Sequence, residues 1–446
     1  MSLATHSGSP KSLPVLEAPS PRRSPMADHH LSGRVWASAA LIAALLPSTW
    51  RLGWWLPLHF LLIGAASQLI IGGQTMFSAT LGVAPGPRRE TTLAQLVLMN
   101  AGVIGISAGR VFGIVSLVAI GALSFLTAVV WSAIVVRSLW RRSLNRRFVE
   151  TGVLYSLASA CVLLGAGMGV AMALGWTNDS ASYASHKLAH MALNLWGWGG
   201  LTILGTMLTL LPTVLHVRAP APKIGRGPWV AFAGLIVMVT FLTLEAYVAG
   251  AAGAALFAFG LARPLMYLRI VASRPRRRNV PAAGLHVGAS VAWMVSVALV
   301  QIVLLARGDL IALRDVWVVG IALGVIGQAL LGAWSFLLPS GRPALAEVRR
   351  RELYAFELGG KPQVAAFNLG LVFLLLELRG LVPASVGAVG IAFVWGAGAW
   401  ALLKCWSFPQ LARLPSMSAR ASRYWLPLDG RGIGTSPINA SQEDAS

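Results

Sequence analysis

Charged side chains are scarce in this chain: they make up 11% of its 446 residues, whereas a soluble domain carries about 25%. Acidic residues are the rarest of them, with 15 against 36 basic residues, so the formal net charge is +21. Hydrophobic residues make up 56% of the chain. This composition excludes an ordinary soluble domain and indicates a membrane protein with several spans.

Cysteine is nearly absent, and motifs for nucleic-acid binding are missing altogether. Cys161 and Cys405 both fall in apolar runs, so no disulfide framework, CxxC redox motif or cysteine zinc site is available. The basic residues form short clusters between apolar runs, where they suit cytoplasmic loops and anionic lipid headgroups. Without a base-stacking or groove-reading motif, the positive charge does not indicate a nucleic-acid partner.

No apolar core of a signal peptide precedes residue 32. Residues 1–32 are rich in Pro, Ser and His, which predicts a disordered cytoplasmic tail rather than a cleaved signal. Met26 is an alternative start to Met1 and would remove most of that tail. Residues 33–408 are predicted to form a transmembrane domain, and residues 409–446, rich in Ser, Pro, Arg and Gly, a second disordered cytoplasmic tail.

About twelve apolar runs reach the roughly 20 residues that a helix needs to cross the hydrocarbon core. They predict an all-α fold, a polytopic transmembrane helical bundle. The expected limits are 34–50, 54–81, 91–109, 111–136, 149–175, 186–216, 228–247, 249–272, 280–305, 316–338, 362–378 and 383–406.

The basic clusters fall in alternate connections between these runs. They are Arg88 and Arg89; Arg137, Arg141, Arg142, Arg146 and Arg147; Arg218, Lys223 and Arg226; Arg274 and Arg276 to Arg278; and Arg349 to Arg351. Because cytoplasmic loops carry the excess of Lys and Arg, both termini are expected in the cytoplasm, with the chain multi-pass in the plasma (inner) membrane. The longest connection, about residues 339–361, has room only for a short amphipathic helix.

Ionisable or strongly hydrogen-bonding side chains inside spans are costly, so each suggests a functional site. His59 in the second span lies roughly 8 Å below the expected outer boundary at about 1.5 Å per residue. His190 in the sixth span lies at a comparable depth, His186 lies one turn nearer the surface, and Glu245 near the outer end of the seventh span can join the same layer. The other candidates are His216, His286, Glu377, Gln68, Gln74, Asn100, Asn194, Gln301, Gln328 and Asn368.

Two histidines at one depth on different helices are what a bis-imidazole haem or a copper centre requires. The spacing of His186 and His190, at i and i+4, puts both rings on one helix face, which is an alternative copper or zinc site. Structural roles, such as a hydrogen bond to a backbone carbonyl or a place at the headgroup level, explain each histidine equally well when it is taken singly. Glycines 197, 199, 200 and 205 follow His190 and leave room for a helix or a flat macrocycle.

Two stretches carry a resemblance to a known family. "LHFLLIGAASQ" around His59 and "HMALNLWGWGGLTILGT" from His190 are similar to the second and sixth helices of divergent haem-copper oxidase subunit I proteins. The most similar branches are the nitric-oxide-response membrane family (NnrS-like) and the membrane modules of actinobacterial copper oxidases and copper nitrite reductases. The resemblance covers about a quarter of the chain and implies a haem-ligand role for His59 and a copper- or haem-ligand role for His190.

The departures from that family are equally informative. A working subunit I has a histidine pair on its seventh helix and haem histidines on its tenth, and the corresponding runs here contain no histidine. A complete oxygen-reducing centre is therefore not expected, and whether the chain is an enzyme stays open. The resemblance implies haem b or copper near the outer face, with Asn194 or Glu245 orienting an imidazole. The function that the resemblance implies is electron transfer or the handling of copper and nitrogen oxides, with a cupredoxin or cytochrome as redox partner.

Two other classes of function remain open from the residues alone. Twelve spans with abundant Gly and embedded Gln, Asn and Glu suit a secondary transporter or permease, although no convincing repeat relates the two halves of the chain. The third possibility is a membrane scaffold without a cofactor, in which the histidines are structural.

Overall fold

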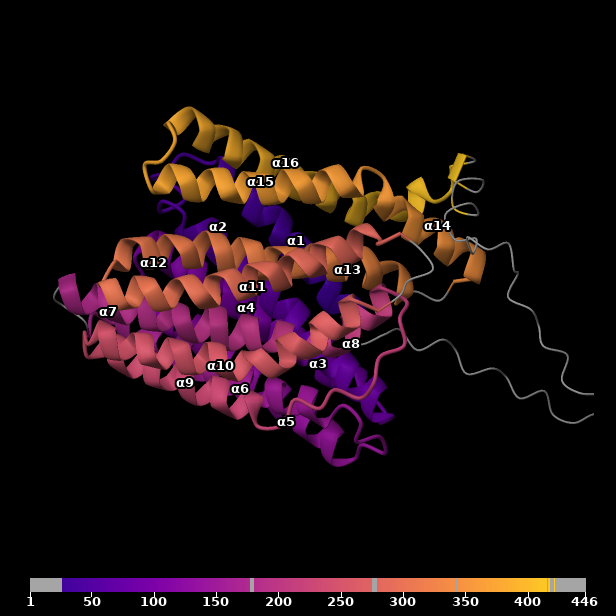
Figure 1. Cartoon of the computed structure of the whole chain (residues 1–446), viewed down its shortest axis with the longest axis horizontal. Coiled ribbons are helices and arrows are strands. Elements are labelled where there is room, and N and C mark those ends of the chain that lie inside the picture. The colour runs from indigo at the N-terminus through magenta and orange to yellow at the C-terminus, as the bar shows by residue number, and fades with distance from the viewer. Residues whose placement is uncertain are drawn as a thin grey trace, which may run out of the picture.

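The computed structural model is described here for residues 26–176, 180–274, 279–341, 344–414, 416–417 and 421. Within these residues every regular element is a helix (Figure 1). Ten helices are long and apolar enough to cross a membrane, and α9, with 17 residues, is a shorter apolar helix. The predicted all-α polytopic bundle is thereby confirmed, while the number of spans, twelve, stays a prediction.

Twelve continuous helical runs build the bundle, in three consecutive units of four. The first unit has α1 (Met26–Leu45), the run α2 (Trp55–His59), η1 (Phe60–Ala66) and α3 (Ser67–Gly82), then α4 (Arg89–Phe112) and α5 (Val115–Arg141). The middle unit has α6 (Val149–Ala173), the run α7 (Ser180–Met191), η2 (Ala192–Leu201) and α8 (Thr202–Val214), then α9 (Gly227–Thr243) and α10 (Tyr247–Ala272). The last unit has α11 (Ala282–Arg307), the run α12 (Leu310–Val316), η3 (Trp317–Gly327) and α13 (Gln328–Ser340), then α15 (Gly360–Leu378) and α16 (Ala384–Leu411). The short helix α14 (Ala346–Glu357) lies between α13 and α15.

Close approaches of glycine show that the three units are built alike. In each unit, one glycine of the second run lies against a residue of the first helix. A second glycine, eight residues further along the second run, lies against the residue that comes seven positions before that one in the first helix. The facing pairs are Gly64 with Trp36 and Gly72 with His29; Gly197 with Cys161 and Gly205 with Leu154; and Gly324 with Trp293 and Gly332 with His286. A side-chain carbon added at Gly64 or at Gly324 would lie 2.7 Å from the tryptophan Cγ. The repeat is a unit of four helices, so it does not divide the chain into halves.

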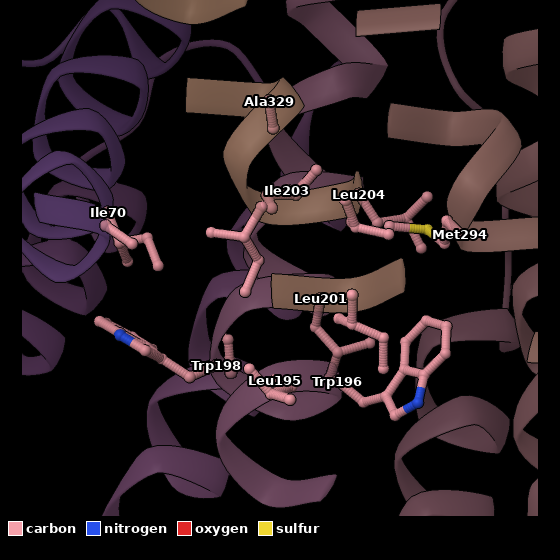
Figure 2. Packing of buried hydrophobic residues seen from close by; sticks show 14 of the residues in the cluster. Ile70, Leu195, Trp196, Trp198, Leu201, Ile203, Leu204, Met294 and Ala329 are labelled. Carbon is pink, nitrogen blue, oxygen red and sulfur yellow. The ribbon is translucent and has the colours of Figure 1, made fainter. Parts of the chain in front are cut away.

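The second run of each unit lies at the centre of the bundle. In these runs 67%, 89% and 78% of the most apolar window is buried, against 28 to 44% in the other candidate spans. Each central run also has a π-helical segment, η1, η2 or η3, which widens the helix locally. Figure 2 shows Ile70, Ile203 and Ala329 from the three central runs around one core.

The two tryptophans of η2 connect the units by hydrogen bonds. Trp196 Nε1 donates to Gln301 Oε1 of α11 at 2.8 Å, and Trp198 Nε1 donates to Ser67 Oγ of α3 at 2.9 Å. The indole of Trp317 in η3 donates to the same Gln301 oxygen at 3.0 Å. Because buried indole N–H groups are stabilised by a partner, these bonds fix how the central runs are rotated.

The connections with the basic clusters meet at the end of the bundle near α14 (Figure 1). Arg147 Nη2 donates to the carbonyl of Ala219 at 2.6 Å, and Arg274 Nη1 to the carbonyl of Arg218 at 2.7 Å. His59 and His190 lie toward the opposite end, near the start of their runs. That the basic end faces the cytoplasm stays a prediction from the charge pattern.

Several element boundaries differ from the sequence prediction by a few residues, and two of the differences concern ionisable side chains. Helix α1 begins at Met26, within the stretch predicted as a disordered tail, because His29 packs on Gly72 and is 1% exposed. Residues 1–25 lie outside the described part of the chain. Helix α9 ends at Thr243, so Glu245 lies in the α9–α10 turn with a left-handed φ of 58° and not inside the seventh span as predicted.

Candidate metal centre

His190 is held by two glycines of the neighbouring helix α6. A carbon added at Gly169 would lie 2.9 Å from His190 Cε1, so the imidazole occupies the space that a side chain would take. His190 Nδ1 donates to the carbonyl of Gly165 at 2.7 Å. With Nδ1 protonated, the lone pair of the ring lies on Nε2, which is the tautomer that a metal ligand needs.

Asn194 packs beside His190 and fills the space over Gly165. A carbon added at Gly165 would lie 2.5 Å from Asn194 Nδ2. Asn194 Nδ2 donates to the backbone carbonyl of His190 at 2.7 Å and lies 3.3 Å from His190 Nδ1. The Gly165 carbonyl is therefore the group that fixes the tautomer of His190, and Asn194 holds the helical turn on which the histidine lies.

His59, on the second run of the first unit, is bonded within its own helix, as His186 is, and not to a neighbouring helix. Its Nδ1 donates to the carbonyl of Trp55 at 2.7 Å, and its ring is stacked on that of Trp55 with the centroids 3.8 Å apart. The Nε2 of His59 is therefore also the nitrogen with the lone pair. The ring is half-buried, so it is held rigidly and still presents one edge.

The two histidines are close enough to interact electrostatically. His190 and the cations Lys187 and Arg110 all act on His59. The cations oppose additional positive charge at the site. Whether the pair binds a metal stays a prediction.

The remaining predicted ligands lie differently. His186 is half-buried, and its Nδ1 donates to the carbonyl of Ser182 at 2.7 Å, so its Nε2 also has the lone pair. Glu245 is exposed in the turn before α10. Over the described residues, no three or more His, Cys, Asp or Glu side chains gather as a metal cluster.

The glycines after His190 are covered by side chains of the protein. An added carbon would lie 2.3 Å from Cys161 Cβ at Gly197, 2.5 Å from Ile326 Cδ1 at Gly199 and 3.1 Å from Leu154 Cβ at Gly205. These glycines serve helix packing, which was the alternative reading of them. In this arrangement they leave no wall for a macrocycle, so the residues fit a single ion better than a haem.

Sequence reasoning found most of a second set of polar groups one by one but missed His29 and the pairing, which recurs in the first and last units. His29 Nδ1 donates to Gln68 Oε1 at 2.7 Å, and at the equivalent place His286 Nδ1 donates to Gln328 Oε1. Seven residues after each histidine a tryptophan indole donates to an asparagine: Trp36 to Asn100 at 2.7 Å and Trp293 to Asn368 at 2.8 Å.

A repeated sequence pattern could have revealed these groups. "HHLSGRVW" from His29 and "HVGASVAW" from His286 both have His and Trp seven apart, and "GAASQLIIG" and "GVIGQALLG" share a central Gln. "QLVLMN" and "QVAAFN" place Gln and Asn five apart. The pattern becomes visible only when the first and last units, about 260 residues apart, are compared. His29 was not considered because residues 1–32 were predicted to be a disordered tail.

A small cavity lies between the three central runs. Its volume is about 60 Å³, room for several waters, and Ala66, Ile70, Ile203, Ala329 and Leu330 are among its mostly apolar lining. Gln74 also lines it: Gln74 Nε2 donates to Thr202 Oγ1 at 3.1 Å, while Gln74 Oε1 is buried without a hydrogen-bond partner. This oxygen is available to a hydrogen-bond donor in the cavity.

The fold and these sites define a multi-pass helical membrane protein with buried polar groups on its central runs. Comparison with known proteins assigns no family: no family model and no curated protein matches the chain.

Proposed function

We propose that this membrane protein binds one copper ion, as Cu(I), between His59 and His190 near the end of the bundle opposite the basic loops. The observation that carries the proposal is the tautomer of the two rings: each has Nδ1 bonded to a backbone carbonyl, which leaves the lone pair on Nε2, and His190 lies near enough to His59 to contribute to its electrostatic environment. Two neutral imidazoles held rigidly away from bulk water are a donor set that suits copper. The resemblance of both stretches to haem-copper oxidase-like proteins supports the same pair of residues.

Copper at this place would supply one-electron chemistry or a storage and transfer site, with a cupredoxin or cytochrome as partner on the outer face. The protein's residues contribute the rest. Trp55 and Gly165 fix the two tautomers through their carbonyls, and Asn194 fixes the turn that presents His190. Haem b is the competing occupant, and it requires the side chains over the η2 glycines to move.

The test is metal analysis of the purified protein together with titration of Cu(I) against a chelator. We expect one copper per chain in the wild type. His59→Ala and His190→Ala should each weaken copper binding by more than about a hundredfold, since loss of a hydrogen-bond partner of a ligand alone costs roughly 10- to 100-fold. His216→Asn is the matched control, because His216 is exposed, lies at the other end of its run and has a left-handed φ of 53° that Asn tolerates.

Three outcomes separate the possibilities. Copper binding that survives in both alanine variants would refute the proposed ligands. A Soret band in the wild type that disappears in both variants would assign the pair to haem b. Absence of both copper and a Soret band would leave a membrane scaffold or a transporter.

A transporter is the second candidate function. A small cavity lies between the central runs, and the Gln74 oxygen, which has no hydrogen-bond partner, is a polar group in its mostly apolar lining. Uptake of a substrate into vesicles that is lost in Gln74→Leu and retained in His59→Ala would support this function over copper binding.

A further inference from the structure

A groove runs along the side of the bundle between α8, α10 and α11. Its volume is about 760 Å³, within the range of small-molecule sites, and its walls are almost entirely apolar. Leu215, Leu265, Ala272 and Gly288 are among the lining residues, and among the described residues that line it Arg269 is the charged one. The groove lies on helices of spanning length, at the half of the bundle that carries the basic loops.

The repeat of the units explains why this groove is open. At the equivalent junction, between α5 and α6, the indole of Trp140 fills the space over Gly152: an added carbon there would lie 2.6 Å from Trp140 Nε1. The corresponding residues 132 positions later are Ala272 and Gly284. Ala272 and Gly284 both line the groove. An added carbon at Gly284 would lie 3.1 Å from Leu215 Cδ2 and from Val280 Cγ1, whereas at Gly288, one turn further along α11, it would meet nothing within 4 Å. The junction that has Ala272 in place of a tryptophan is therefore filled over Gly284 and open over Gly288.

The lining identifies the chemistry of the occupant. An apolar groove on a membrane-spanning surface excludes water and favours a hydrocarbon chain. Arg269 is exposed in the last turn of α10, and Arg274, which follows two residues after the helix, is held by its bond to the Arg218 carbonyl. Two cations beside the end of an apolar groove suit a phosphate, because basic pockets between helices at this face attract anionic headgroups.

We propose that the groove between α8, α10 and α11 binds an anionic phospholipid, with an acyl chain along Leu215, Leu265 and Gly288 and its phosphate at Arg269. The site lies near the ends of α8 and α10, whereas His59 and His190 lie near the starts of their runs, and it does not depend on the metal. At the α10–α11 junction, a bound lipid takes the place that the Trp140 indole has at the α5–α6 junction. It thereby completes the packing between the middle and last units.

The chain offers variants matched to this proposal. Ala272→Trp copies the filled junction, and Arg269→Gln removes the charge at the groove. Arg137→Gln is the control, since Arg137 occupies the equivalent place on α5, 132 residues earlier, beside the filled junction. Ala272→Leu is a milder filling variant, for use if the tryptophan variant does not fold.

The experiment is native mass spectrometry of the purified full chain, titrated with phosphatidylglycerol or with phosphatidylcholine. We expect the wild type to retain one phosphatidylglycerol in preference to phosphatidylcholine. Arg269→Gln should weaken phosphatidylglycerol binding about fivefold, the effect of one basic residue, and leave phosphatidylcholine unchanged. Ala272→Trp, or Ala272→Leu in its place, should lose the bound lipid of either kind, while Arg137→Gln should bind like the wild type.

Several results would overturn the proposal. Equal binding of the two lipids by the wild type would remove the phosphate site. Full lipid retention in both filling variants would show that the lipid lies elsewhere. Equal losses of phosphatidylglycerol binding in Arg137→Gln and Arg269→Gln would show that the effect comes from the net charge of the protein and not from a phosphate site at Arg269. A co-purifying protein in place of lipid, lost in Ala272→Trp, would show that the groove receives a partner helix.

Discussion

The buried His29–Gln68 pair allows a quantitative test of how the polar groups of the bundle are held. His29 is 1% exposed and Gln68 0% exposed, and the bond between them is 2.7 Å long. The middle unit has Leu154 and Leu201 at the equivalent places, so the fold accepts an apolar pair there. We therefore expect Gln68→Leu and His29→Leu to destabilise singly, because each leaves a buried group without its partner, by about 1–3 kcal/mol.

The double variant His29→Leu/Gln68→Leu should be less destabilised than the sum of the single variants. The coupling energy expected for a hydrogen bond within a membrane is about 0.6 kcal/mol on average and about 1.7 kcal/mol at most. The assay is reversible unfolding in mixed micelles, with the free energy of unfolding extrapolated to the same detergent composition for all four proteins. Leu201→Gln in the middle unit, which introduces an amide without a partner, should destabilise by a similar 1–3 kcal/mol and is the reciprocal control.

Two results would refute this reasoning. Strict additivity of the two single variants would show that the bond contributes nothing to the folded state. A neutral effect of Leu201→Gln would show that the bundle supplies water or other partners at this depth, and that the contrast between the units has no energetic meaning.

Two further predictions concern glycines at close approaches. Gly169→Ala should displace the His190 ring, because the added carbon would lie 2.9 Å from it. We expect copper affinity, measured by chelator titration, to fall by roughly 10- to 100-fold. Gly167→Ala is the control and should leave copper affinity unchanged, because its added carbon would meet nothing within 4 Å. Gly234→Ala should destabilise the α9–α10 pair by about 1–3 kcal/mol in the same micelle unfolding assay, because the added carbon would lie 2.2 Å from the backbone nitrogen of Phe257; unfolding identical to that of Gly167→Ala would contradict it.

The candidate site was only partly predictable from sequence. Depth along a helix follows from the rise per residue, so His59 and His190 could be placed in one layer. Their partners could not be found this way, since the carbonyl that fixes His190 belongs to Gly165 on another helix, 25 residues earlier in the chain. The role of the glycines after His190 depended on which side chains face them: Cys161 and Leu154 belong to α6, and Ile326 belongs to η3.

The sequence by itself determined that this is an all-α membrane protein, because long apolar runs with few charges are stable only as helices in a bilayer and are visible one at a time. It also determined which loops carry the positive charge. The tertiary structure decided what depends on distant residues meeting: the three-unit repeat, the burial of His29 by Gly72, and the groove left open by Ala272 where Trp140 fills its counterpart. Hydropathy is a sum over neighbours in the chain, whereas packing and hydrogen bonding depend on neighbours in space.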